Sequence, residues 1–178
     1  MLVAISFLLS CNGNSLEKWK NFSTENTSYR LPPRWIVFDP YKIKNLYWTY
    51  QWFRYFPPND CRMALFKSPP ADQTQFFTII GPKETLEGPL NNCLTKYNND
   101  ATIESICRHE YSTSNGIKIE LFKANKKSSR FDAEPVSYFI GFGEFGDSIF
   151  ILNGGARLPR LDMNIIKCFI ESLELSEH

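Results

Sequence analysis

The length, composition and charge of the chain are those of an ordinary globular domain, and they exclude one class of ligand. Its 178 residues are about the length of one domain and are enough to bury a core. Hydrophobic residues make up 43% and charged residues 22%, as is usual for a globular protein. The chain has 20 basic and 19 acidic side chains, so it lacks the excess of basic residues that a nucleic-acid-binding protein would show.

The first eleven residues predict export and a membrane anchor. Residues 1–9 are apolar apart from Ser6, and they lead into Leu8-Leu9-Ser10-Cys11, which resembles a bacterial lipobox. The resemblance implies that Cys11 carries a lipid, which would hold the protein at the outer membrane, facing the periplasm. The alternative is a plain signal-peptide remnant with an incidental cysteine. The apolar run is too short to span a bilayer, so the lipid would be the only membrane contact.

Behind the anchor we expect a tether and then a single domain. Residues 12–28 are polar and rich in Asn, Ser and Thr, which favours a flexible tether. Residues 29–178 would then form one folded α/β domain. Pro32 and Pro33 prevent a helix at its start, and Trp35 to Phe38 is typical of a short strand.

An aromatic segment follows, between Tyr41 and Phe56, and it fits neither strand nor helix spacing. Its rings must point in several directions, so we expect some of them at the surface. Tryptophan and tyrosine dominate the energetics of protein interfaces, which makes this segment a candidate partner-binding patch. The alternative is a strand whose aromatic residues cover the edge of the core. The predicted partner-binding residues are Tyr47, Trp48, Tyr50, Trp52 and Tyr55.

The middle of the chain predicts strands, one helix and a hairpin. Residues 61–67 and 75–80 are expected strands, the second rich in β-branched and aromatic residues. A helix is expected through about Tyr97, with its regular part starting at Pro89, because proline is tolerated at the first helical position. Asn115-Gly116 lies between the runs 102–111 and 117–124, which is typical of a β-hairpin.

The last third predicts a second hairpin and a closing helix. Residues 137–142 and 148–152 are β-rich runs separated by turn residues, and a glycine-rich turn is expected at Asn153–Gly155. After Pro159, apolar residues recur every three to four positions, so we expect an amphipathic helix that packs over the sheet. Its apolar face consists of Ile165, Ile166, Phe169, Ile170 and Leu173.

Cysteines other than Cys11 are even in number, and in an exported chain this indicates two disulfides with three possible connectivities. Cys93 and Cys107 are near one another in sequence, so we expect Cys93–Cys107 together with Cys61–Cys168. The alternative is four buried thiols. Without a Cys-x-x-Cys pair or a histidine cluster, no metal site is expected.

Few residues suggest chemistry, and we expect neither an enzyme nor a cofactor. His109 is a candidate base, with Cys107 or Ser112 as a nucleophile, but the sequence identifies no activating third group. A half-exposed strand histidine is the simpler interpretation. Glu144 and Asp147 lie in one turn and could share a calcium ion, although their spacing is not that of a known calcium loop.

Five segments together resemble the PsbP-like lipoproteins and their relatives. The resemblance implies an α+β fold, in which an antiparallel sheet is flanked by helices as an α/β/α sandwich, and a scaffold that binds other proteins. The aromatic segment and the four domain cysteines depart from the family pattern. The similar segments are Leu31-Pro32-Pro33-Arg34-Trp35, Phe77-Thr78-Ile79-Ile80, Asn115-Gly116-Ile117-Lys118-Ile119, Tyr138-Phe139-Ile140 through Ile149-Phe150-Ile151-Leu152-Asn153-Gly154-Gly155, and Ile170-Glu171-Ser172-Leu173.

The sequence therefore predicts a non-enzymatic, periplasm-facing lipoprotein that binds a protein partner. Because some type VI immunity lipoproteins resemble this family, the leading hypothesis is an immunity protein that inhibits a secreted effector. The alternatives are an envelope assembly or accessory lipoprotein and a weak hydrolase that uses His109. A fold does not fix a function, so the resemblance carries this hypothesis as an analogy.

Overall fold

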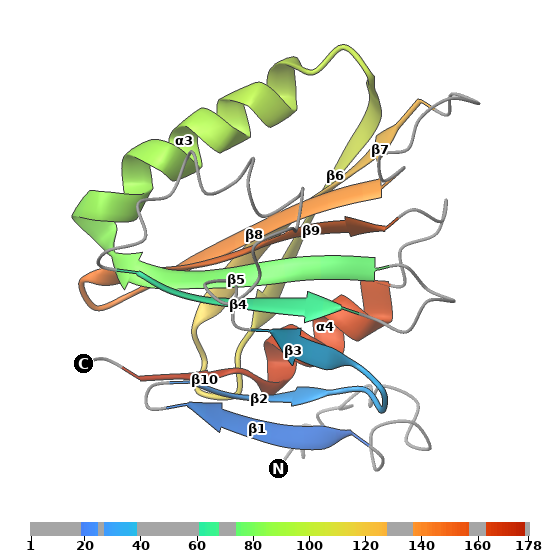
Figure 1. Cartoon of the computed structure of the whole chain (residues 1–178). Coiled ribbons are helices and arrows are strands. Elements are labelled where there is room, and N and C mark those ends of the chain that lie inside the picture. The colour runs from blue at the N-terminus through green and yellow to red at the C-terminus, as the bar shows by residue number, and fades with distance from the viewer. Residues whose placement is uncertain are drawn as a thin grey trace, which may run out of the picture.

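A computed structural model describes residues 19–24, 27–38, 61–67, 74–127, 137–156 and 163–176 (Figure 1). Within these ranges the chain forms strands in two antiparallel sheets and two helices. The helices are α3 (Lys83–Asn99) and α4 (Met163–Ser172). The strands are β1 (Lys20–Thr24), β2 (Thr27–Leu31), β3 (Ile36–Phe38), β4 (Arg62–Lys67), β5 (Thr74–Pro82), β6 (Ile103–Ser112), β7 (Lys118–Lys126), β8 (Ser137–Phe145), β9 (Ser148–Ala156) and β10 (Glu174–Leu175).

The large sheet has the strand order β3-β4-β5-β9-β8-β7-β6, and a small sheet has the order β1-β2-β10. Every pairing in both sheets is antiparallel. Helix α3 lies over one face of the large sheet, while α4 and the small sheet lie on the other (Figure 1). The predicted α+β class with an antiparallel sheet between helices is therefore confirmed.

Strand β9 is at the centre of the large sheet and shows why the two layers form. Ile149 and Ile151 join the cluster beneath α3, whereas Phe150 and Leu152 join the cluster beneath α4. Each of these four side chains is at most 1% exposed. Full burial of such a side chain stabilises the fold by about 1.5–3 kcal/mol, so a sheet covered on both faces favours a continuous apolar run.

The N-terminal prediction needs a correction. Residues 20–24 and 27–31 form a β-hairpin, not the expected tether. Phe22 is directly opposite Tyr29, and their rings stack with centroids 5.7 Å apart. Tyr29 in turn packs on Phe169 of α4 at 5.6 Å, so the hairpin is fixed to the core by aromatic contact. Residues 12–18, the rest of the predicted tether, lie outside the described ranges.

Two further boundaries differ from the prediction. Helix α3 starts at Lys83, so Pro89 lies inside it. Proline cannot donate a backbone hydrogen bond, and the burial of Leu86, Leu90 and Cys93 offsets the free energy lost with that bond. Asn153–Gly155 lies within β9 and is not a turn. Gly154 is instead needed for close packing, because a Cβ there would lie 2.3 Å from the carbonyl oxygen of Gln75.

The remaining predicted elements are confirmed to within a few residues. Both hairpins form, with Gly116 and Gly146 at positive φ in their turns, and the closing helix buries Ile166, Phe169 and Ile170. Neither helix in the described ranges combines the length and the hydrophobicity that a membrane span requires.

Candidate functional site: a groove between the first hairpin and the last helix

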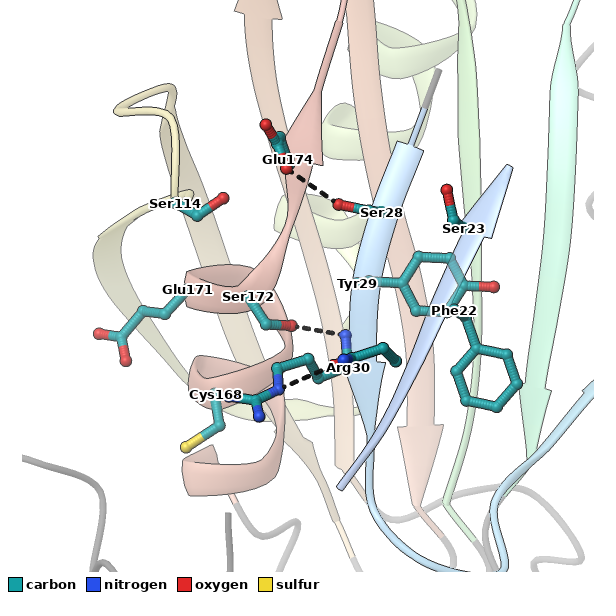
Figure 2. Close-up of a pocket in the computed structure, with 11 residues that line it drawn as sticks. Phe22, Ser23, Ser28, Tyr29, Arg30, Ser114, Cys168, Glu171, Ser172 and Glu174 are labelled. Atoms are coloured by element: carbon teal, nitrogen blue, oxygen red, sulfur yellow. Dashed lines mark hydrogen bonds between the residues drawn. The ribbon is translucent and has the colours of Figure 1, made fainter. Parts of the chain in front are cut away.

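A groove lies between the β1–β2 hairpin, the end of α4 with β10, and the turn at Ser114 (Figure 2). Its volume is about 620 Å³, within the range of about 300–1,000 Å³ that is usual for ligand sites. Its walls come from three parts of the chain that are far apart in sequence, so only the folded protein has this groove.

Backbone and hydroxyl groups connect the hairpin to α4 at the base of the groove. The backbone N–H of Arg30 donates to Ser172 Oγ at 2.9 Å (Figure 2). That hydroxyl donates in turn to the carbonyl oxygen of Phe169 at 2.8 Å. The Arg30 guanidinium donates through Nε to Asn21 Oδ1 at 3.1 Å, which holds this long side chain along the hairpin. The groove is therefore formed before any ligand arrives.

The charged side chains that line the groove are mainly acidic. Arg30 is the cation, and Glu171 and Glu174 are the anions, so the described lining carries a net charge of −1. Glu174 accepts a hydrogen bond from Ser28 Oγ at 3.1 Å across the β2–β10 pair, and Glu171 lies 3.7 Å from Lys167. Glu171 and Glu174 are both exposed, so their carboxylates remain accessible to solvent or to a partner.

The turn that connects β6 to β7 forms the third wall. Both the backbone N–H and the hydroxyl of Ser114 donate to the carbonyl oxygen of Leu173, at 2.8 and 2.6 Å. The side-chain amide of Asn115 donates to the carbonyl oxygen of Leu175 at 2.5 Å. The first two bonds satisfy the carbonyl oxygen of Leu173, the residue that follows α4, and the third reaches β10, so together they fasten the tip of the hairpin to the end of the chain segment 163–175.

An aromatic chain supports the groove from below. Phe169 packs on both Tyr29 and Phe76, and Phe76 also contacts Trp35 at 5.5 Å and Phe139 at 6.1 Å. Burial raises the pKa of the Tyr29 phenol, so this hydroxyl stays protonated at neutral pH. A rigid apolar support of this kind holds the polar side chains above it in one arrangement.

The candidate catalytic residues lie elsewhere, on β6. Cys107 and His109 do share one face of the strand, as their spacing predicts, and Cys107 is exposed while His109 is half-buried. The imidazole stacks on Tyr111, with ring centroids 6.0 Å apart and an interplanar angle of 7°. Ser112 is the last residue of the strand and not part of the loop.

Glu144 and Asp147 have structural partners at the start of α3. Lys83 Nζ lies 2.5 Å from Glu144 Oε2, and the Lys83 backbone N–H donates to the Asp147 carbonyl oxygen at 2.8 Å. The hydrogen bond with Glu144 raises the pKa of the lysine. No cluster of three or more metal-ligating side chains occurs among the residues that the structure describes.

The predicted disulfide pairs are wrong. Cys61, Cys93 and Cys107 form no disulfide, so neither Cys93–Cys107 nor Cys61–Cys168 forms, although Cys168 is itself disulfide-bonded. The sheet explains this, because Cys61 belongs to the cluster beneath α3, whereas Cys168 lies on α4 at the other face. Cys93 and Cys107 are likewise on opposite sides, since Cys107 shares its face of β6 with Tyr111, which packs in the α4-side cluster. Nearness in sequence was a misleading guide.

A second, smaller cavity of about 180 Å³ lies between the end of α3 and the sheet. Cys93, Tyr97 and Asn153 are among the side chains that line it. Burial raises the pKa of Cys93 to about 12 and also raises the pKa of Tyr97. The Tyr97 hydroxyl is buried without a well-directed hydrogen bond, although the nearby backbone of Ala124 opposes the rise in its pKa.

Two of the sequence-based predictions concern residues outside the described ranges. Cys11, the predicted lipidation site, precedes residue 19. The predicted partner-binding residues Tyr47, Trp48, Tyr50, Trp52 and Tyr55 lie between the described ranges 27–38 and 61–67. The structure therefore tests neither the lipidation of Cys11 nor the partner-binding role of the aromatic segment.

The groove itself was missed at the sequence level. A signal for the hairpin was present in the alternation of Tyr29 and Leu31, with Phe22 upstream, but the polar residues between them favoured a tether. No local pattern predicts that Ser114 and Ser172 meet the hairpin.

Comparison with known proteins identifies a similar fold but no family. No family model matches the chain, and no curated protein matches it by sequence. Among solved structures, the solution structure of cyanobacterial PsbP (CyanoP) from Synechocystis sp. PCC 6803 is similar, with a TM-score of 0.52 and 12% sequence identity. The alignment covers 95% of this chain and 99% of that one. At this identity the likeness supports the predicted PsbP-like fold alone.

Proposed function

We propose that this protein is a non-enzymatic lipoprotein that binds and inhibits a secreted effector, with the groove as the docking site for a loop of that effector. Cys11 would carry the lipid that anchors the domain to the outer membrane, facing the periplasm. The observation that carries the proposal is the groove of about 620 Å³, whose polar walls are already fixed by internal hydrogen bonds.

The arrangement of the groove favours binding over chemistry. Three of the four serine hydroxyls that line it donate to internal acceptors: Ser28 to Glu174, Ser114 to the Leu173 carbonyl, and Ser172 to the Phe169 carbonyl. A hydroxyl committed in this way needs an adjacent base to become a nucleophile, and His109 is not among the residues that line the groove. A preformed, hydrogen-bonded groove instead reduces the entropic cost of docking a partner.

The charge of the groove indicates the chemistry of the docked loop. Glu171 and Glu174 are exposed at its rim and outnumber Arg30, so a lysine or arginine side chain of the partner fits better than an acidic one. The serine hydroxyls and the backbone around them add hydrogen-bonding positions for the peptide groups of such a loop.

The test is recovery of the partner from a native envelope extract with two matched charge variants. Glu171→Lys with Glu174→Lys reverses the charge of the groove, whereas Glu84→Lys with Glu87→Lys makes the same change on exposed positions of α3, which lies on the other face of the sheet. We expect wild type and the α3 variant to retain one stoichiometric partner, and the groove variant to bind it at least tenfold more weakly.

Identification of that partner by mass spectrometry tests the function itself. A secreted hydrolase whose activity falls on binding supports the immunity role, and resident envelope machinery would support an accessory lipoprotein instead. Equal binding by the groove variant would refute the groove as the docking site. The anchor is tested separately, because Cys11→Ala should move the protein from the membrane fraction to the soluble fraction.

A further inference from the structure

Strand β6 forms one edge of the large sheet and has an unusually open outer side. It is ten residues long, compared with about five or six for a typical strand. Within the described ranges it pairs with β7 alone. The side chains of Arg108 and Glu110 are 67% and 63% exposed, and Ile106 is 40% exposed, so α3 does not cover this face of the strand.

This edge carries charged side chains but lacks several other features that usually prevent strand pairing. Proteins protect an exposed edge with proline, lysine, a bulge or a covering loop. Residues 103–112 contain neither proline nor lysine, and the one irregularity in the β6–β7 ladder lies between Ile103 and Ser105. Among the residues that the structure describes, the segment from Ile106 to Ser112 is therefore a regular edge with no strand paired on its outer side.

The turn between β6 and β7 determines which residues of β6 direct their backbone N–H and C=O groups away from the sheet. The backbone N–H of Thr113 donates to the Ile117 carbonyl at 2.9 Å, so Thr113 points toward β7. Because the direction alternates along an antiparallel ladder, the backbone groups of four residues point away from the sheet. These residues are Ile106, Arg108, Glu110 and Ser112.

We propose that the β6 edge pairs with β6 of a second copy of this chain, antiparallel and with the two-fold axis at His109, to join the two large sheets. This register places Arg108 opposite Glu110 of the second copy, and the reverse. Ile106 and Ser112 also face one another across the interface. All four residues are those whose backbone groups point outward, so the pairing makes about eight new backbone hydrogen bonds.

Charge complementarity selects both the occupant and the register. Within one chain, Lys118 lies 3.3 Å from Glu110, and Arg108 lies 2.5 Å from Glu120. In the proposed register, Glu110 of one copy lies opposite Arg108 of the second copy. The row of charges then runs from Lys118 to Glu110 in the first copy and from Arg108 to Glu120 in the second, with the sign alternating at each step. An axis at Cys107 would instead oppose Glu110 to Glu104, and an axis at Arg108 would oppose two guanidinium groups.

We expect a reversible dimer whose stability depends on the opposite charges at positions 108 and 110. In neutral, low-salt buffer with a reductant, sedimentation equilibrium of the full chain should reach twice its 20.7 kDa. Arg108→Glu and Glu110→Arg each place like charges opposite one another at both symmetric positions. Each variant alone should therefore dimerise roughly 30-fold more weakly, because two attractive pairs become two repulsive ones.

A 1:1 mixture of the two variants gives the decisive result. A chain with glutamate at both positions faces a chain with arginine at both, so the mixture should recover dimer while each variant alone stays largely monomeric. The exposed substitutions Glu87→Arg and Lys20→Glu, which lie away from β6, provide matched controls and should dimerise like wild type. Circular dichroism of each variant verifies the fold.

Several results would overturn the proposal. These are a wild-type chain that remains monomeric at about millimolar concentration, a mixture that recovers no dimer although both variants fold, and a dimer that reductant abolishes. If either charge variant fails to fold, Ile106→Lys changes the same edge without touching an ion pair, and this variant should be monomeric. Wild-type dimerisation by Ile106→Lys would equally refute the interface.

Discussion

Gly154 provides a sharp test of the central strand pairing. In the β5–β9 ladder it is opposite Phe76, and in the β8–β9 ladder it is opposite Phe139. A Cβ at this position would lie 2.3 Å from the Gln75 carbonyl oxygen, 2.4 Å from Phe76 Cβ and 2.7 Å from Phe76 Cα. The first contact is 0.7 Å short of the 3.0 Å that real Cβ atoms almost always keep, and the obstructing atoms belong to backbone or to a Cβ.

Gly154→Ala should therefore force β5 and β9 apart where Phe76 supports the aromatic chain below the groove. Overpacking of a rigid core costs about 1–3 kcal/mol, and we expect the upper end, because no flexible side chain can yield here. For a domain of this length, about 3 kcal/mol lowers the midpoint of thermal unfolding by roughly 6–12 °C.

The assay is thermal and urea unfolding, followed by circular dichroism, with Gly88→Ala as the matched control. Gly88 lies inside α3, and a Cβ there would meet nothing within 4 Å. Replacing glycine by alanine in a helix interior should raise the free energy of unfolding by about 0.5–1 kcal/mol. If Gly154→Ala unfolds within about 1 kcal/mol of wild type, the register that opposes Gly154 to Phe76 is wrong.

Two other predictions concern the small cavity behind α3. Because burial raises the pKa of Cys93 from 9.0 to about 12, the thiol ionises in the unfolded chain before it does in the folded one, so stability should fall as pH rises from 9 to 12. Cys93→Ala should flatten this fall in urea titrations, and parallel losses in both proteins would contradict the assignment. Tyr97→Phe removes a buried hydroxyl that lacks a well-directed hydrogen bond. It should leave the free energy of unfolding unchanged or raise it by up to about 1 kcal/mol, whereas a loss of more than that would mean that the hydroxyl has a strong partner.

The elements that could be predicted are those whose pattern follows from burial. The closing helix has an apolar stripe because α4 packs against one layer, and residues 149–152 are continuously apolar because both faces of β9 are covered. In such elements the sequence carries the same information as the packing, so periodicity alone identifies them.

Other features depend on a partner strand that the sequence does not specify. Gly154 suggests a turn when considered alone, and only the proximity of Phe76 explains why glycine is needed within the strand. The cysteine pairing failed for a related reason, since Cys61 and Cys168 lie on opposite sides of a sheet whose position no local pattern gives.

The groove could not have been predicted from local sequence. Arg30 and Ser172 meet across 142 residues of sequence, and Ser114 reaches Leu173 across 59. Each residue by itself is an ordinary polar residue, without the spacing of a catalytic or ligand-binding motif. Their significance arises from tertiary contact alone.

The long sequence separation of these contacts also determines when the groove can form during folding. Loop closure over such distances is slow, because its entropic cost must be met before the contacts form. The β1–β2 hairpin is synthesised well before its docking surface on α4 and β10. A nascent chain in which β10 has not yet been made therefore has no groove, and the hairpin should dock only after α4 and β10 have been synthesised.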